Sequence, residues 1–192
     1  MEHALPLALG PHAIAPPVFL APLAGITDLP FRRLVASFGA GLVVSEMVAS
    51  AEVVRAHPEM RARAELGLGE QATAVQLAGR DPWWMAEAAR FVEAQGARII
   101  DINMGCPSKR VTTGLCGSAL LRDLDLALEL IKAVVGAVKV PVTLKTRLGW
   151  DHDSLNAPQI AKSAEGAGVA MVTIHGRTRQ QFYKGAADWA AI

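Results

Sequence analysis

The sequence predicts an α/β protein with a (β/α)8 TIM barrel fold, truncated to about six βα units. Short apolar runs rich in β-branched residues alternate with amphipathic stretches of helix length, as parallel strands covered by helices do. Five successive runs end in a polar or reactive residue, which is typical of a barrel whose strand ends share one face. An open doubly wound sheet would gather such residues at a single point instead.

Six apolar runs are predicted to be strands: Pro17–Gly25, Gly41–Met47, Ala72–Gly79, Ala97–Gly105, Val140–Trp150 and Val169–Arg179. Helices are expected between them at 28–40, 51–56, 81–96, 125–138 and 157–168, and a further helix is expected to begin at "DWAAI". Asp28 and Asp81 are suited to cap two of these helices. Gly39 and Gly96 are suited to end them. We expect residues 1–192 to form one incomplete barrel domain.

Composition narrows the class of protein. Of the 192 residues, 52% are hydrophobic and 19% are charged, which indicates a folded globular chain. The sequence has neither a long uninterrupted apolar run nor a secretion signal, so we expect no membrane association and a cytoplasmic location. Two cysteines, Cys106 and Cys116, lie in one segment, and a reduced protein is the simpler interpretation. The net charge of +1 does not by itself indicate a nucleic-acid partner.

The polar residues at the strand ends are the candidates for chemistry. They are Glu46, Gln76, Asn103 with Cys106, Lys145 with Arg147, and His175 with Arg177. No metal-ligand spacing is visible, so no metal is expected. A G-x-G-x-x-G fingerprint is also missing, which argues against a dinucleotide-binding Rossmann domain.

Four separated segments carry a family resemblance. "FLAPLAGITDLPFRRL", "INMGCPSKRVTTGLCGSALL", "VTLKTRLGW" and "VTIHGRTRQQFYKGAADW" resemble the tRNA-dihydrouridine synthase family, most closely its bacterial B-type branch, over roughly Val18 to Ile192. The resemblance implies an N-terminal FMN-binding barrel and a C-terminal helical domain that helps to hold tRNA. It also implies reduction of the C5–C6 double bond of specific uridines, with FMN that NADPH has reduced.

The resemblance also implies roles for individual residues. Cys106 falls on the catalytic cysteine of the family's Asn-x-Gly-Cys-Pro motif, and Asn103 falls on its asparagine. The implied flavin-binding positions are Pro22, Leu23, Ala24, Gln76, Lys145 and His175. Later flavin-phosphate loops and the helical domain would fall beyond Ile192. Cys116 stands where the family usually has a small residue, and it is given no role.

The chemistry of the side chains fits these roles, and each has a simpler alternative. Because no side chain donates hydride, hydride must come from a cofactor. A thiol is mostly protonated at neutral pH, so Cys106 can supply the proton, or it is only a small buried residue at a strand end. Asn103 can fix the uracil or only shape a turn. Lys145 can stabilise a reduced flavin or pair with Glu46 or another carboxylate. Gln76 and His175 can bind flavin or be structural, and Glu46 is left undecided.

Cations are expected around Cys106. Those that follow the last three strands are Lys109, Arg110, Arg147, Arg177, Arg179 and Lys184. They predict a basic rim that binds the tRNA backbone, although ordinary solvated loop charges would give the same pattern. Two other functions stay open. One is an FMN barrel that acts on a free small molecule of the dihydropyrimidine or dihydroorotate type. The other is an inactive fragment that binds RNA or a partner through the exposed edge of its half-barrel.

Overall fold

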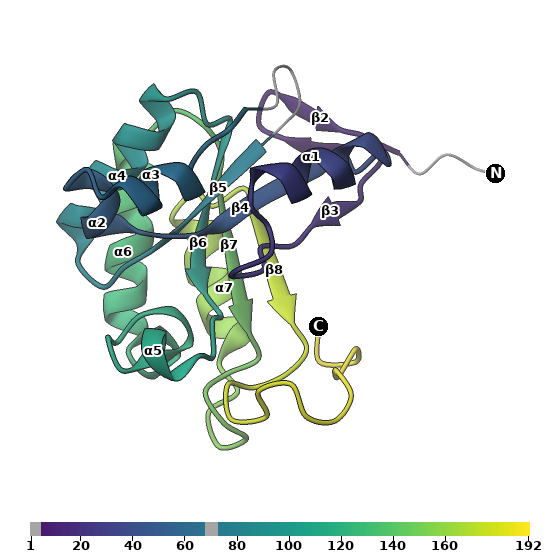
Figure 1. Ribbon diagram of the computed structural model, residues 1–192. Coiled ribbons are helices and arrows are strands. Elements are labelled where there is room, and N and C mark those ends of the chain that lie inside the picture. The colour runs from purple at the N-terminus through teal and green to yellow at the C-terminus, as the bar shows by residue number, and fades with distance from the viewer. Residues whose placement is uncertain (1–4, 68–72) are drawn as a thin grey trace.

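Six parallel strands form one curled sheet in the computed structural model, which describes residues 5–67 and 73–192 (Figure 1). The strands are β3 (Phe19–Leu20), β4 (Leu42–Ala49), β5 (Thr73–Ala78), β6 (Ile99–Met104), β7 (Val142–Arg147) and β8 (Met171–His175). Each strand pairs with the next one along the chain. This is the strand order of a (β/α)8 barrel, so the predicted α/β half-barrel is confirmed. Ala72, predicted to start the third strand, lies outside the described residues.

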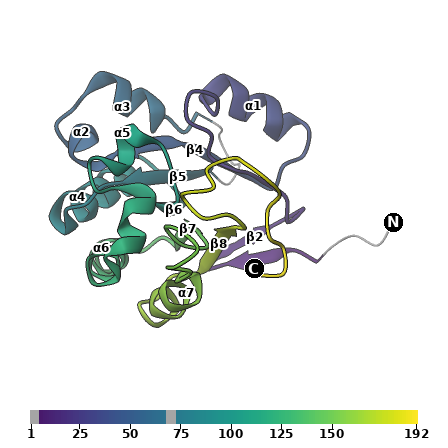
Figure 2. The same ribbon diagram turned by 90° about the horizontal axis from the view of Figure 1, so that it is seen from below.

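The helices cover the outer face of the curled sheet (Figure 2). They are α1 (Leu29–Ser37), α2 (Ser50–Val54), α3 (Pro58–Arg63), α4 (Pro82–Ala94), α6 (Leu124–Ala137) and α7 (Ala157–Gly166). The predicted caps are confirmed, because the carboxylates of Asp28 and Asp81 accept hydrogen bonds from backbone N–H groups in the first turns of α1 and α4. Gly39 and Gly96 follow these helices with φ of +89° and +99°. Glycine adopts this backbone conformation without strain, so both helices can end there.

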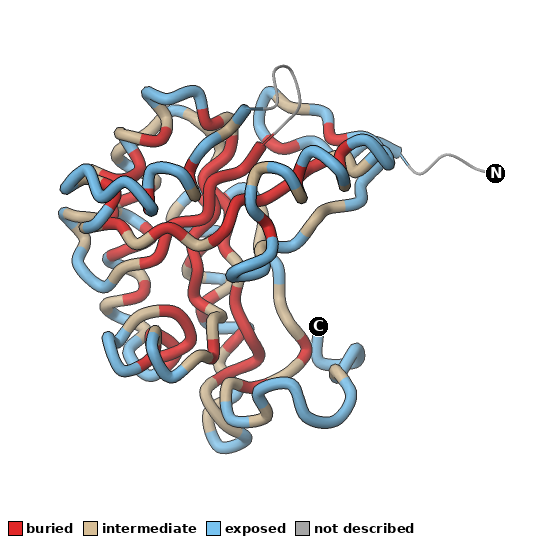
Figure 3. Tube along the Cα trace, viewed as in Figure 1, coloured by how far each residue is buried: buried red, intermediate tan, exposed pale blue. Residues whose placement is uncertain are grey.

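The larger hydrophobic core lies between the sheet and the helices. It contains outward-facing strand residues and the buried sides of α4 and α6, including Val75, Leu77, Ile100, Ile102, Leu144, Met85, Ala89, Leu130 and Ile131. The buried path of the tube in Figure 3 follows these strands through the centre of the molecule. This layer holds the strands in register, so it also fixes the relative positions of the strand ends.

A second, smaller core lies on the concave face of the sheet, at the amino ends of the strands. A hairpin of β1 (Leu7–Leu9) and β2 (His12–Ile14) contributes Leu9 and Ile14, each 1% exposed. They pack against the strand residues Leu42, Val44, Ala74 and Ile99. The sequence analysis missed this hairpin, because three-residue strands are too short to show an alternating pattern. It closes the amino end of the concave face and leaves the carboxyl end open to function.

Other short elements also differ from expectation. The helix α3, the helix α5 (Lys109–Thr112) and the 3-10 helix η1 (Gly117–Arg122) were not predicted. At "DWAAI" the structure has a turn, not the expected helix, and the Asp188 carboxylate accepts hydrogen bonds from the N–H groups of Ala190 and Ala191. Residues 176–192 run as loops at the carboxyl ends of β7 and β8 (Figure 1).

None of the helices in the described residues has the length and apolar character needed to cross a bilayer.

Candidate active site

The carboxyl half of the concave face is polar. The sheet register aligns Gln76 with Asp101, Asp101 with Thr143, and Asn103 with Lys145. Because alternate strand residues point to opposite faces, these side chains lie on the side away from the helices. The same alternation adds Arg147 and His175, which are also register partners. The strand ends that the sequence singled out in β5 to β8 are therefore brought together by the fold.

Cys106 follows β6 directly, and Asn103 holds its backbone. The Asn103 Oδ1 atom accepts hydrogen bonds from the N–H groups of Gly105 (3.2 Å) and Cys106 (3.0 Å). The thiol is half-buried and unbridged, and its Sγ lies 3.6 Å from the Ser108 Oγ. Asn103 thus shapes the turn, and this arrangement leaves the Cys106 side chain partly accessible at the carboxyl end of the sheet.

Two residues that the sequence analysis missed hold Cys106 from the other side. The Cys106 carbonyl oxygen accepts hydrogen bonds from the backbone N–H (3.1 Å) and the hydroxyl (2.9 Å) of Ser118. Gly117 has φ of +60°, and a Cβ built there would lie 2.9 Å from the same carbonyl oxygen. Only glycine permits this approach without displacement. The two glycines and the small serine of "GLCGS" were the signal in the sequence that could have indicated this close packing.

A buried hydrogen-bond network joins three strands behind Asn103. The Gln76 Oε1 accepts from the Asn103 Nδ2 at 2.8 Å, and the Gln76 Nε2 donates to the Asp101 Oδ2 at 2.6 Å. The Thr143 hydroxyl donates to the other Asp101 oxygen, also at 2.6 Å. Asp101 was missed because its strand was read as an apolar run. A polar pair at positions i and i+2, Asp101 and Asn103, was the signal that one face of this strand is polar.

Burial changes the ionisation of the two charged residues in this network. Burial raises the pKa of the Asp101 carboxyl, while hydrogen bonds from Thr143 and Gln76 and the charge of Lys145 act in the opposite direction. Burial lowers the pKa of the Lys145 ammonium, and Asp101 opposes that shift. The sequence left Lys145 between flavin binding and pairing with Glu46 or another carboxylate, and in the structure the carboxylate that acts on its charge is Asp101. The Lys145 amine is half-buried on the concave face.

The turn after β3 contains the three apolar positions implied in flavin binding. Leu23 and Ala24 are exposed and Pro22 is half-buried. Buried Thr27 closes the turn, since its hydroxyl oxygen lies 3.1 Å from both the N–H and the carbonyl oxygen of Leu23. The Glu46 Oε2 accepts a hydrogen bond from the Gly25 N–H at 2.9 Å. The turn thus presents small and apolar residues on a fixed base.

Arg147 was expected on the basic rim, but in the structure it is buried beneath that rim. It is 2% exposed, and its guanidinium donates to the carbonyl oxygens of Gly105 (2.8 Å), Thr178 (3.0 Å) and Phe182 (2.9 Å). These bonds tie the Cys106 turn to the segment that follows β8. Its predicted contact with substrate stays a prediction, whereas its hydrogen bonds in the structure go to backbone carbonyl oxygens.

His175 and Arg177 form a pair at the end of β8. The Arg177 Nη1 lies 3.0 Å from the His175 Nε2, and since arginine only donates, Nε2 accepts and the ring proton is on Nδ1. Burial, followed by the charges of Arg147, Lys145 and Arg177, lowers the pKa of His175 to about 4. At neutral pH the imidazole is therefore uncharged and offers an N–H donor.

The remaining predicted cations lie at the same end of the molecule (Figure 1). Lys109 and Arg110 are exposed in α5, and Lys184 is exposed in the loop after β8. The Arg179 guanidinium lies 4.7 Å from the centroid of the Trp150 ring, which Arg122 also approaches at 5.0 Å. We call Lys109, Arg110, Arg177, Arg179 and Lys184 the basic border, and their predicted contact with tRNA stays a prediction.

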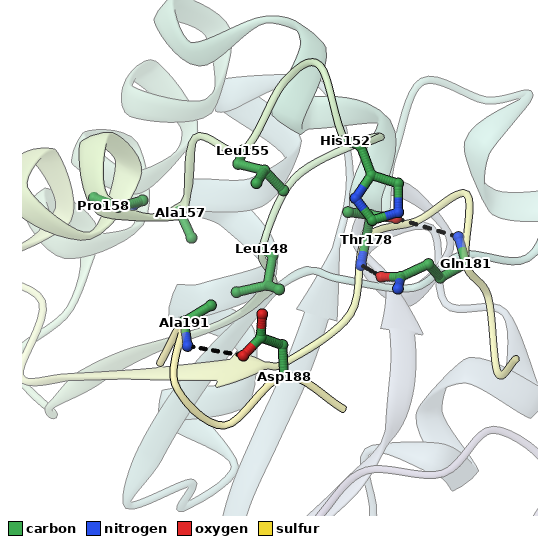
Figure 4. A pocket seen from close by; sticks show the side chains of 9 residues that line it. All are labelled: Leu148, His152, Leu155, Ala157, Pro158, Thr178, Gln181, Asp188 and Ala191. Atoms are coloured by element: carbon green, nitrogen blue, oxygen red, sulfur yellow. Dashed lines mark hydrogen bonds between the residues drawn. The ribbon is translucent and has the colours of Figure 1, made fainter. Parts of the chain in front are cut away.

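A separate hollow of about 260 Å³ lies between the β7–α7 loop and the last residues of the chain (Figure 4). Its lining is largely apolar and comprises Leu148, His152, Leu155, Ala157, Pro158, Thr178, Gln181, Asp188 and Ala191. None of the predicted site residues lines it.

Within 5–67 and 73–192, no group of three or more His, Cys, Asp or Glu residues is arranged to hold a metal ion.

Comparison with known proteins agrees with the motifs. A family model described as "Dihydrouridine synthase (Dus)" matches residues 19–192. A "Probable tRNA-dihydrouridine synthase" of Rhodobacter capsulatus is 67% identical over 92% of this chain and 55% of that protein. A protein of the same description from Rhizobium leguminosarum bv. phaseoli is 60% identical over 91% of this chain and 55% of its own length.

The B-type resemblance has a counterpart among the relatives. A "tRNA-dihydrouridine synthase B" of Xanthomonas campestris pv. campestris is 49% identical over 97% of this chain and 56% of that protein. The chain therefore spans about half the length of the curated relatives that it matches. Because the family model covers most of the chain, this chain belongs to the dihydrouridine synthase family.

Proposed function

We propose that the protein reduces the C5–C6 double bond of specific uridines in cytoplasmic tRNA to give 5,6-dihydrouridine, with FMN as cofactor and NADPH as its reductant. The observation that carries this proposal is the partly accessible Cys106 thiol at the end of β6, beside the polar concave face. The names of the relatives, which are tRNA-dihydrouridine synthases, support tRNA as the substrate. Residues 1–192 would supply the FMN-binding barrel part of the catalytic domain.

The residues present fit a flavin. A flat ring with several carbonyl and imine acceptors needs donors along its edge and a smooth apolar surface on one face. Lys145 supplies an amine donor, His175 supplies a neutral N–H donor, and Gln76 supplies an amide held in one orientation. Pro22, Leu23 and Ala24 supply the apolar surface, and no atom lies within 4 Å of a Cβ built on the neighbouring Gly25. When bound and reduced, the cofactor would supply hydride for C6 of the uracil.

The remaining chemistry falls to this chain. Cys106 would give its thiol proton to C5 of the uracil. A positioned acid of this kind contributes about 10²- to 10⁴-fold to a rate. Asn103 accepts hydrogen bonds from the N–H groups of Gly105 and Cys106, so in this proposal it fixes the position of the acid, and its amide edge would also contact the uracil ring.

The basic border would bind the RNA backbone. Lys109, Arg110, Arg177 and Arg179 are the proposed contacts, and Arg147 would act below them by holding the Cys106 turn against the loop after β8. Phosphate contacts of this kind make affinity fall steeply as salt rises. A uridine within folded tRNA must also be unstacked to reach the thiol.

The test is the dihydrouridine content of tRNA. Cells that lack the gene should contain uridine at a position where wild-type cells contain dihydrouridine, as measured by mass spectrometry of tRNA fragments. The wild-type gene and a Cys116→Ala control should restore the modification, and Cys106→Ala should not. Unchanged tRNA in the deletion strain would sink the proposal. If free uracil were reduced instead, the small-molecule oxidoreductase would be the better assignment.

A further inference from the structure

Strand β4 contains a bulge where its sequence predicted a regular strand. Val44 pairs with Ala74 and Met47 pairs with Gln76, so three steps along β4 match two steps along β5. The extra residue lies at Ser45–Glu46. The Ser45 hydroxyl fills the gap, since its oxygen accepts a hydrogen bond from the Gln76 N–H at 3.1 Å and donates to the Glu46 carbonyl at 2.8 Å. Bulges of this kind change the direction of a side chain and are common next to active sites.

The side chain that the bulge redirects is a buried carboxylate. Glu46 is 7% exposed, and its Oε2 accepts the Gly25 N–H at 2.9 Å. The same oxygen lies 3.6 Å from the Arg63 Nη1, and Arg63 is itself partly exposed. A buried carboxylate is costly unless it is paired and hydrogen-bonded, and these two contacts meet that need.

Gly25 can reach this carboxylate because of its backbone conformation. Its φ is +76°, which glycine adopts readily, and a Cβ there would meet no other atom. The turn has three fixed points: the Glu46 bond at Gly25, the Thr27 hydroxyl at Leu23, and a hydrogen bond from the fully buried Arg32 Nε to the Thr27 carbonyl at 3.1 Å. Of these, Glu46 is the one that reaches the turn from a neighbouring strand, β4.

We propose that Glu46 is a positioning residue for cofactor binding, which holds the Leu23–Thr27 turn through Gly25 in the shape that the flavin ring lies against. This inference rests on the proposed function, which puts the flavin on Pro22, Leu23 and Ala24. Glu46 itself does not touch the reacting atoms. The sequence left Glu46 undecided between contact with the substrate and support of another residue, and this proposal assigns it the second role.

Three variants of the intact protein separate the hydrogen bond from the charge. Glu46→Gln keeps an oxygen that can accept from the Gly25 N–H, whereas Glu46→Leu removes it at similar size. Arg63→Gln is the matched control, because it removes the neighbouring cation and leaves the Gly25 bond in place. Affinity for FMN is measured on flavin-free protein by quenching of flavin fluorescence, and the melting temperature of each variant checks its folding.

We expect FMN affinity to fall in Glu46→Leu and to stay near wild type in the other two variants. Glu46→Leu should weaken FMN binding about tenfold or more, because a loose turn must be ordered when the ring binds. Glu46→Gln and Arg63→Gln should each stay within about threefold of wild type. FMN affinity unchanged in a folded Glu46→Leu protein would overturn the proposal, as would equal losses in Glu46→Gln and Glu46→Leu.

A second measurement needs no cofactor and no catalysis. Amide hydrogen exchange of the peptide that contains Gly25 should be about tenfold faster in Glu46→Leu than in wild type, with Glu46→Gln close to wild type. If Glu46→Leu does not fold, Glu46→Ala takes its place in both measurements, because it also removes the oxygen that accepts from the Gly25 N–H. If wild-type protein bound no FMN while Gly25 exchange followed this pattern, the proposed function would fail and the role of Glu46 in the turn would stand. Equal exchange in all variants would overturn that role.

Discussion

At the scale of single residues, burial on the concave face raises the pKa of Asp101 and lowers the pKa values of Lys145 and His175. Apolar runs end at Cys106, Asn103, Gln76, Lys145 and His175, so the positions of these residues at the strand ends were predictable, and their roles in the chemistry stay predictions. Their partners were not, since a hydrogen-bond partner across the sheet depends on register, which one strand does not reveal. Asp101 is an example. It lies within an apolar run, and only its hydrogen bonds with Gln76 and Thr143 show that it belongs to a polar network.

Asp101 is expected to stabilise the fold through its two hydrogen bonds. Asp101→Leu leaves the Gln76 amide and the Thr143 hydroxyl without their buried acceptor, so it should lower the free energy of unfolding by about 1–3 kcal/mol, as measured in urea. Asp101→Asn, which still offers one oxygen to Gln76, should lose less. Equal stability of wild type and Asp101→Leu would show that the network adds nothing to folding.

His175 gives a prediction about pH. Its pKa is lowered to about 4 in the folded protein from an ordinary value of 6.5, so between these values the unfolded chain binds a proton that the folded chain does not. Stability due to this residue is therefore present above about pH 6.5 and is lost as pH falls towards 4. His175→Asn should show a smaller drop in melting temperature over this window. Comparison at each pH cancels the carboxyl groups common to both proteins, and parallel curves would contradict the assignment.

At the scale of elements, long and regular segments were predictable and short ones were not. The α4 helix has an aspartate cap, a proline and a terminal glycine, and its predicted position is confirmed. The β1–β2 hairpin, α5 and η1 have too few residues to show a period, and tertiary contacts decide their conformation. The bulge in β4 was invisible for the same reason, since one extra residue changes no apolar pattern.

Gly117 connects η1 to the active site. Gly117→Ala places a Cβ in a left-handed conformation and 2.9 Å from the Cys106 carbonyl, so it should destabilise the protein by about 1–3 kcal/mol and slow turnover. Gly136→Ala, where a Cβ in α6 meets nothing, is the matched control and should leave both quantities close to wild type or slightly raise stability. Thermal melting and dihydrouridine formation measure the two effects. A Gly117→Ala protein as active and stable as the control would contradict this account.

At the scale of the whole molecule, strand order and the shared direction of the strand ends were predictable from alternation alone. The division of the concave face was not: its amino end is an apolar core sealed by the hairpin, and its carboxyl end is polar. The hairpin's contribution depends on residues outside the barrel repeat. The basic border also follows from the fold, because α5 and the loop after β8 lie at the same end (Figure 1).

The hairpin is expected to be a structural plug. Leu9→Ala empties a site that is 1% exposed, so it should cost about 2–5 kcal/mol of unfolding free energy. Leu7→Ala in the same strand, where the side chain is 37% exposed, is the control and should cost far less. Urea denaturation of the two variants gives the comparison. Equal midpoints would mean that the hairpin does not seal the concave face.

The central claim is that Cys106 is the acid that protonates uracil. Its most direct test follows flavin absorbance in stopped flow, first during reduction by NADPH and then during reoxidation by unmodified tRNA. In Cys106→Ala, reduction by NADPH should proceed at the wild-type rate, and reoxidation by tRNA should slow about 10²- to 10⁴-fold. Reoxidation at the wild-type rate in Cys106→Ala would contradict the account.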